Sequence, residues 1–219
     1  MDTENRVKVW DLGVRVFHWS LVVLFITAYI SGEEESDLHA YAGYCICGLI
    51  IFRIIWGFVG GQYARFSDWI YGPGKTLAYL NSIRDGSPAH YMGHNPLAGW
   101  MILTLLIFVS AILWSGLNLY GAEGHGPLAG DAYSLVAPAL ADDEREDDDD
   151  EDEDEHHGRG ERGDHDEEAE EFWEDIHEAL ANFTLLLVIL HVAGVLIASR
   201  IEKENLIKAM ITGYKRKRD

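Results

Sequence analysis

The chain has 219 residues and a formal net charge of −20, with 48% apolar residues. Of its 37 acidic side chains, 20 lie in residues 141–171 beside only three basic ones, so the rest of the chain is close to neutral. Outside a short run at residues 215–218 there is no basic patch, which argues against nucleic acid as a partner.

Four apolar segments are each long enough to cross a bilayer as a helix. In chain order they cover residues 14–31, 40–59, 97–117 and 179–199. Because hydrocarbon offers no hydrogen-bond partner to the backbone, each segment is predicted to be helical. Tryptophan and tyrosine residues lie near the segment ends, as they do at membrane interfaces. The sequence therefore predicts an all-α membrane protein, a four-transmembrane-helix bundle surrounded by membrane lipid.

Basic residues indicate how the spans are oriented. Lys and Arg occur in the N-terminal residues 1–13, in the loop at 60–96 and in the tail at 200–219, whereas the loop between the first two spans has none. The loop between the third and fourth spans has three, none of them close to a span. Both termini and the 60–96 loop are therefore predicted to be cytoplasmic. The acidic segment is predicted to face the periplasm of a Gram-negative bacterium, with the chain in the inner membrane.

Histidine is costly and rare inside a hydrocarbon span, so each one found there is a candidate functional residue. His18 and His39 begin the first and second apolar segments, and the fourth segment has His177 at its start and His191 in its body. Because they are fourteen positions apart, His177 and His191 are about 21 Å apart along a helix and about 40° apart around it. They share one helix face, near opposite sides of the membrane.

Depth sorts these four histidines into two pairs. With the termini in the cytoplasm, His39 and His177 lie near the outer face, and His18 and His191 lie nearer the cytoplasm. Each pair joins two helices across the bundle interior, where a haem iron can take one imidazole from each side. An interhelical hydrogen bond is the alternative for any single histidine. A tetrahedral zinc site is disfavoured because the ligands lie at two levels.

Two further residues near the cytoplasmic ends have more than one interpretation. Arg53 lies inside the second span, where a charge must pair or reach the interface. It either contacts a propionate of the cytoplasmic-side haem or extends to the aqueous boundary. His94 precedes the third span and either caps that helix, contacts a propionate or lines a quinone site. The structural role is favoured, because Asn95-Pro96 is typical of a turn that leads into a helix.

The acidic segment at 141–171 is low in complexity and cannot form a core, so it is predicted to be a disordered outer loop. Its histidines, His156, His157 and His165, are weak candidates for binding divalent cations. A solvated spacer, or a docking surface that steers a basic partner such as a periplasmic cytochrome c, is the favoured interpretation.

Several motifs resemble one known family. The stretches VWDLGVRVFHW, HAYAGYCICGLIIFRIIWGFVGG, GHNPLAGWM and IHEALANFTLLLVILHVAGVLIASR are similar, in order and in spacing, to the bacterial cytochrome b561 family. This family includes the b-type cytochrome subunit of membrane-bound nickel–iron hydrogenases. The resemblance covers about residues 7–130 and 172–217. It implies a four-helix membrane bundle with two b-type haems in its interior. The implied axial ligands of the haem irons are His18, His39, His177 and His191.

The predicted spans and the acidic segment together give a domain organisation. Residues 1–13 form a cytoplasmic N-terminus, residues 14–140 hold the first three spans with their loops, and residues 172–199 form the fourth span. The acidic loop is inserted at 141–171, and residues 200–219 form a basic cytoplasmic tail.

The implied function is electron transfer across the inner membrane between a quinone pool and a redox partner of a respiratory chain. A hydrogenase, a dehydrogenase and a periplasmic cytochrome c all fit as that partner. A stand-alone quinol oxidoreductase that acts on oxygen or superoxide is one alternative, although no acid–base or nucleophile motif supports it. A divalent-metal transporter that traps metal in the acidic loop is the other.

Overall fold

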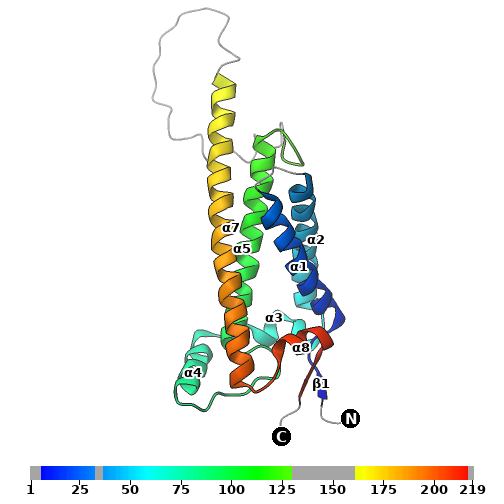
Figure 1. Ribbon diagram of the computed structural model, residues 1–219, viewed down its shortest axis with the longest axis vertical. Helices are drawn as coiled ribbons and strands as arrows, with labels where there is room; N and C mark the ends of the chain where they lie inside the picture. The colour runs from blue at the N-terminus through cyan, green and yellow to red at the C-terminus, as the bar shows by residue number, and fades with distance from the viewer. Residues whose placement is uncertain (1–5, 33–36, 130–160, 217–219) are drawn as a thin grey trace, which may run out of the picture. The chain divides into compact units, whose positions relative to one another are not determined.

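The computed structural model describes residues 6–32, 37–129 and 161–216, with side chains described outside residues 161–168. This part of the chain is mostly helical (Figure 1). It divides into two compact units. Met1–Ser110 and Phe183–Asp219 form the first unit, and Ala111–Asn182 form the second.

Within the described residues, four helices are long and apolar enough to cross a membrane. They are α1 (Leu12–Ser31), α2 (Asp37–Val59), α5 (Pro96–Ala122) and the part Ala169–Ile201 of α7 (Glu161–Ile201). Each contains one of the apolar segments expected from the sequence, so the prediction of four helical spans is confirmed at the level of length and composition. Many large apolar side chains on these helices are exposed, such as Ile30 at 71% and Phe58 at 70%. Surrounding hydrocarbon would cover such surfaces.

The fourth helix begins earlier than the sequence indicates. The sequence predicts a loop through residue 171, whereas α7 begins at Glu161. Acidic residues suit the first turns of a helix, because the helix dipole places partial positive charge there, and glutamate is a good helix former. Apolar composition marks only the part of a helix that crosses the membrane, and α7 continues beyond it.

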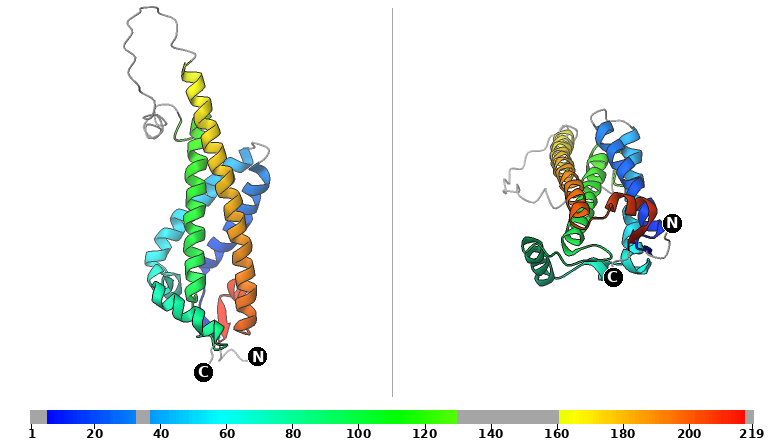
Figure 2. Two further views of the ribbon diagram at one scale, coloured as in Figure 1. Left: turned by 90° about the vertical axis from the view of Figure 1, so that its left-hand side faces the viewer. Right: turned by 60° about the horizontal axis from the view of Figure 1, so that its bottom comes forward.

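The helices α1 and α2 pack side by side in the first unit (Figure 2). Asp11 joins them at the end where α1 begins. Its Oδ1 accepts the Val14 N–H at 2.8 Å as the N-cap of α1, and its two carboxylate oxygens accept the indole N–H of Trp56 at 3.2 and 3.1 Å. A cap of this kind stabilises a helix by about 1 kcal/mol. The bond to Trp56 also sets how the helices that carry His18 and His39 lie against each other.

Short elements lie between and after the long helices. The 3-10 helix η2 (Gln62–Ala64), α3 (Phe66–Trp69) and α4 (Pro73–Arg84) follow α2, and α8 (Leu206–Thr212) follows α7. All of them belong to the first unit. They lie at the end of that unit where α1 begins (Figure 1).

A two-stranded antiparallel sheet joins β1 (Arg6–Lys8) to β2 (Tyr214–Arg216). The expectation of an all-α fold is corrected here, because strands of three residues are too short to show an alternating pattern. We call β1, α8 and β2 the terminal platform. Gly213 ends α8 at φ 88°, and its carbonyl accepts the N–H groups of Val9 at 2.9 Å and Trp10 at 3.1 Å. A Cβ on this glycine would stand 2.7 Å from the Trp10 carbonyl oxygen, so the position requires glycine.

Candidate functional site

His18 and His191 interact electrostatically in the first unit. His18 is on α1 and His191 is on α7, and their imidazoles are within electrostatic range of each other. The Nδ1 of His18 is buried and has no hydrogen-bond partner among the described residues. A buried polar atom without a partner is rare in proteins, so this geometry favours a further group beside the two rings. The same two residues form the inner pair selected from the sequence by depth.

His39, in the first turn of α2, is held by the backbone of α1. Its Nδ1 is 2.9 Å from the carbonyl oxygen of Ala28. A carbonyl oxygen only accepts, so Nδ1 carries the proton and the ring lone pair is on Nε2. A carbonyl at one ring nitrogen orients an imidazole for metal binding at the other and raises its basicity. The tautomer of His39 therefore suits coordination of an iron through Nε2.

His177 makes a comparable contact in the second unit. It lies on α7, and its Nδ1 is 3.0 Å from the Oγ of Ser115 on α5. Ser115 is only 1% exposed, and its Oγ is also 3.0 Å from the carbonyl oxygen of Ile112. The sequence analysis selects neither Ser115 nor the adjacent Gly116. A serine followed by a glycine inside an apolar helix is typical of close helix packing, but it points to a site only once the neighbouring ring is known.

A further polar residue lies between the two histidines of α7. Thr184 is seven positions from His177 and seven from His191, which places all three on one helix face. Its side chain is fully buried, and its Oγ1 has no hydrogen-bond partner among the described residues. Three positions beyond His191, a Cβ on Gly194 would meet nothing within 4 Å. The face of α7 that carries His191 thus has a buried polar group two turns before it, and the exposed Gly194 leaves open space one turn after it.

Arg53 is buried in α2, at 4% exposed, and packs against aromatic rings. Its Cζ lies 5.1 Å from the ring centroid of Phe66 and 5.5 Å from that of Trp69, which is within cation–π range. Its Nη1 is buried without a hydrogen-bond partner, and no salt bridge reaches it, in the part of the chain that the structure describes. An arginine that only extended to the aqueous boundary would be exposed. Asp11 is within electrostatic range of Arg53 but accepts no hydrogen bond from Nη1, so this atom can still donate to a further anionic acceptor.

His94 lies in the loop before α5 and packs against an indole ring. Its ring centroid is 4.4 Å from that of Trp10. Burial is the main cause of a pKa of His94 lowered to about 3. Electrostatic interactions with Lys215, Arg53 and His191 add to this effect. His94 is therefore neutral at physiological pH.

The cap of α5 is Asn95, the residue after His94. Its Oδ1 accepts the Ala98 N–H at 2.9 Å, and Pro96 is the first residue of the helix. This is the turn expected from the Asn-Pro pair. The capping role considered for His94 is thereby taken by its neighbour.

The residues around the four histidines fit a haem. Two imidazoles, those of His39 and His177, have their Nδ1 atoms hydrogen-bonded, and the other two interact electrostatically. A bis-histidine haem with anionic propionates would supply an acceptor for the buried Nη1 of Arg53. No three His, Cys, Asp or Glu side chains converge as zinc requires within the described residues. The acidic-segment candidates His156 and His157 lie outside the described residues, as does the side chain of His165.

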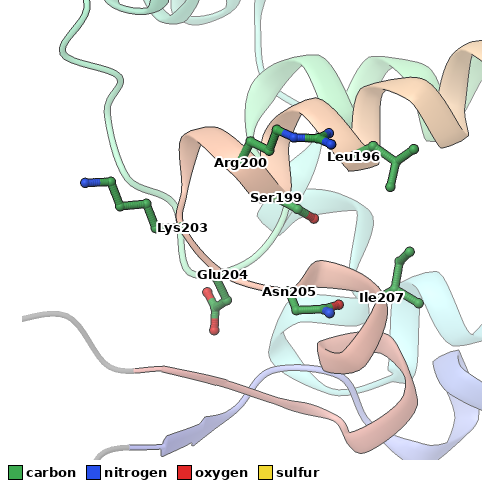
Figure 3. A pocket seen from close by; sticks show the side chains of 7 residues that line it. All are labelled: Leu196, Ser199, Arg200, Lys203, Glu204, Asn205 and Ile207. Atoms are coloured by element: carbon green, nitrogen blue, oxygen red, sulfur yellow. The ribbon is translucent and has the colours of Figure 1, made fainter.

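An open pocket at the turn between α7 and α8 is separate from these histidines (Figure 3). Its lining residues are Leu196, Ser199, Arg200, Lys203, Glu204, Asn205 and Ile207. None of the four histidines lines it, and Arg200 and Lys203 are exposed. It therefore does not serve as the haem site.

Comparisons with known proteins point to one family. A family model described as prokaryotic cytochrome b561 matches residues 9–213. Three relatives share one kind of name. Two are named probable Ni/Fe-hydrogenase B-type cytochrome subunit, and the one from Escherichia coli is named probable Ni/Fe-hydrogenase 1 B-type cytochrome subunit. The relative from Bradyrhizobium diazoefficiens is 32% identical over 148 residues, which is 55% of this chain and 60% of the relative.

The other two relatives are more distant in identity. The one from Cupriavidus necator is 21% identical over 241 residues, which is 96% of this chain and 87% of the relative. The one from Escherichia coli K12 is 23% identical and covers 59% of this chain and 64% of the relative. The chain thus spans less than two thirds of the length of two of these three relatives. No solved structure matches the chain.

The neutral state of His94 predicts a loss of stability in acid. In the unfolded chain a histidine binds a proton below about pH 6.5, whereas in the folded protein the pKa of His94 is about 3. Between these values the unfolded state binds more protons. The free energy of unfolding should therefore fall as the pH is lowered from about 6.5 toward 3, by up to about 1.4 kcal/mol per pH unit. Thermal unfolding in detergent at about pH 7.5 and about pH 5 measures this fall.

The matched variant is His94→Gln, which keeps a polar side chain but has no titrating group. Its melting temperature should fall less between the two pH values than that of the unaltered protein. An equal fall in both proteins would assign the acid sensitivity to other groups and contradict the prediction.

Proposed function

The chain belongs to the prokaryotic cytochrome b561 family, and from this premise we propose that it is a dihaem b-type cytochrome that transfers electrons between a quinone pool and a redox partner. Its four long apolar helices and its family indicate a bacterial membrane protein. The observation that carries the proposal is the arrangement of four histidines on three of these helices. Two have Nδ1 hydrogen-bonded, and the other two interact electrostatically.

We assign one haem to His39 and His177 and the other to His18 and His191. The assignment is supported by the tautomer of His39, by the contact of His177 with a serine hydroxyl and by the electrostatic interaction of the other two rings. When bound, each haem supplies one-electron redox chemistry, with no open iron position for oxygen or substrate, since both axial ligands are imidazoles. This chemistry disfavours the alternative of a stand-alone oxidoreductase that acts on oxygen or superoxide.

Arg53 is proposed to bind a propionate of the haem held by His18 and His191. Its guanidinium already packs against the rings of Phe66 and Trp69, which orient it. The buried Nη1 is a donor without a partner in the described residues, and a carboxylate is the acceptor that an arginine fork matches best. The partner charge would also offset the cost of burying a guanidinium inside a span.

The membrane orientation rests on the basic residues. The N-terminal segment, the 60–96 loop and the tail after α7 carry most of the Lys and Arg residues that flank the helices, which favours the cytoplasmic side for both termini. The acidic segment then faces the periplasm. In this orientation His39 and His177 serve the outer haem, and His18 and His191 serve the inner one.

A hydrogenase is the redox partner that the relatives favour. All three are named as B-type cytochrome subunits of Ni/Fe hydrogenases. We propose by this likeness that the chain accepts electrons from a hydrogenase and passes them to quinone. A dehydrogenase and a periplasmic cytochrome c are the other partners to be tested.

The ligand assignment predicts that haem loss is separable. The substitution His177→Ala should remove the haem shared with His39 and spare the one held by His18 and His191. The haem content per chain should then fall to about half, because each iron depends on its own pair of imidazoles. Pyridine haemochrome assay of the purified protein, with a reduced-minus-oxidised spectrum, measures the content.

The control is His90→Ala, which changes an exposed histidine outside the four and should keep both haems. Full haem content in His177→Ala would refute the assignment. A purified protein without any b-type spectrum would refute the whole proposal and leave the divalent-metal transporter as the better interpretation.

The Arg53 assignment predicts a change in one midpoint potential. In Arg53→Gln the haem held by His18 and His191 should become harder to reduce, because a positive charge that stabilises the added electron is removed. If the reduced haem loses about 1.4 kcal/mol of stabilisation, its midpoint potential falls by about 59 mV, since one electron is transferred. Arg53→Lys keeps the charge and should shift the potential less. Arg84→Gln makes the same charge change at an exposed position at the end of α4, and an equal shift there would contradict the contact.

The partner assignment predicts reduction by hydrogen. Membranes that contain the chain and its hydrogenase should reduce quinone under hydrogen gas, and deletion of the chain should abolish this while hydrogen still reduces a soluble dye. The spectrum of the b-type haems reports the electron transfer directly. If formate or a reduced cytochrome c reduces the b-type haems and hydrogen does not, another partner is identified and the assignment of a hydrogenase is overturned.

A further inference from the structure

One turn of α5 is built around the ring of His177. Ser115 and Gly116 are adjacent in α5, and both approach the same imidazole on α7. Ser115 contributes its hydroxyl, 3.0 Å from Nδ1. Gly116 has no side chain and so leaves room for the ring. A Cβ there would stand 2.9 Å from Cε1 and 3.2 Å from Nδ1 of His177. All three residues belong to the second unit.

The hydrogen positions follow from what each group can do. A serine hydroxyl has one hydrogen to donate and two lone pairs to accept. The carbonyl oxygen of Ile112, 3.0 Å away, can only accept, and the hydroxyl donates to it. The contact with His177 then has Nδ1–H as the donor and Oγ as the acceptor. A chain of two hydrogen bonds thus runs from the imidazole through the hydroxyl of Ser115 to the backbone of α5.

The consequence for His177 is a defined tautomer. With the proton on Nδ1, the lone pair lies on Nε2, the nitrogen that would bind iron. His39 reaches the same tautomer through the carbonyl of Ala28. His18 differs from both, because its Nδ1 is buried with no partner in the described chain. The two histidines assigned to the outer haem therefore share a feature that His18 lacks.

An acceptor at Nδ1 changes the ligand as well as its orientation. It draws the N–H proton toward itself, so the imidazole becomes more basic and a stronger donor to a metal. A stronger donor stabilises ferric iron relative to ferrous iron, which lowers the midpoint potential. Removal of such outer partners typically weakens metal binding by about 10- to 100-fold.

We propose that Ser115 and Gly116 are positioning residues for the axial ligand His177, and that the Ser115 hydroxyl lowers the midpoint potential of the haem bound there. The inference rests on the proposed function, in which His177 is an axial ligand. Gly116 lets the ring lie against the backbone of α5, and Ser115 fixes its rotation and its proton.

The test is a redox titration, monitored by absorption, of the purified full-length protein with both haems bound. The haem to follow is the one that His177→Ala removes. In Ser115→Ala this haem should become easier to reduce, by about tenfold in the equilibrium constant for its reduction. For one electron this corresponds to a rise of about 59 mV. The other haem should keep its potential. Ser115→Thr keeps the hydroxyl and should restore the original value.

The matched control is Ser110→Ala. Ser110 lies on the same helix and donates to the carbonyl of Leu106 at 2.7 Å, but its hydroxyl is exposed. The loss of this hydroxyl should leave both potentials unchanged. Equal potentials in Ser115→Ala and Ser110→Ala would overturn the proposed role of Ser115.

Gly116 has a readout of its own. In Gly116→Ala the added methyl group displaces the ring, so the electron paramagnetic resonance signal of one low-spin ferric haem should shift or its occupancy should fall. An unchanged signal at full occupancy would overturn the role of Gly116. If Ser115→Ala does not accumulate, Ser115→Thr replaces it as the test. A shifted midpoint potential in Ser115→Thr overturns the hydroxyl as the determinant. The original potential in Ser115→Thr, together with a shifted signal in Gly116→Ala, supports the proposal.

These outcomes separate the two levels of the argument. Retention of both haems in His177→Ala refutes the proposed function, and the inference falls with it. Loss of one haem in His177→Ala, together with an unaltered potential in Ser115→Ala, leaves the function standing and refutes only the inference.

Discussion

Every polar group inside these apolar helices must find its partner within the protein or in a group that the protein binds, because hydrocarbon offers none. His39 meets this constraint with a backbone carbonyl, and His177 meets it with a serine hydroxyl. Arg53 lies against aromatic faces and keeps one N–H group without a partner in the described chain. Each of these contacts orients its side chain and so sets the direction in which the remaining polar atom can bind a further group. The candidate site is thus a consequence of how few hydrogen-bond partners the helices provide.

The same constraint extends to the terminal platform. Lys215 is only 3% exposed, and it pairs with Glu202 at 3.7 Å and donates to the carbonyl of Gly93 at 3.3 Å. Its charge is one of those that keep the adjacent His94 neutral. The environment of His94 therefore depends on residues more than a hundred positions away in the sequence. Local sequence around His94 carries no sign of this.

Apolar composition was enough to predict the four long helices, because an apolar run of span length is unusual. The free-energy cost of placing a histidine in hydrocarbon was enough to select the four histidines, because a histidine within such a run is also unusual. The extension of α7 to Glu161 could not be predicted from apolar character, since its first turns are acidic. The terminal platform depends on pairing between distant three-residue strands. Ser115 was missed because a single serine in a helix becomes informative only when the neighbouring ring is known.

The pairing of β1 with β2 has a consequence for the order in which the chain is assembled. β1 precedes the first span and β2 follows the fourth, so β1 has no strand partner until all four spans have been synthesised. At about 5–20 residues per second this interval lasts on the order of ten seconds or more. During it the end of the first unit near His94 lacks both Lys215 and the sheet. The charge of Lys215 that helps to keep His94 neutral therefore reaches it only after the whole membrane-spanning part of the chain has been made.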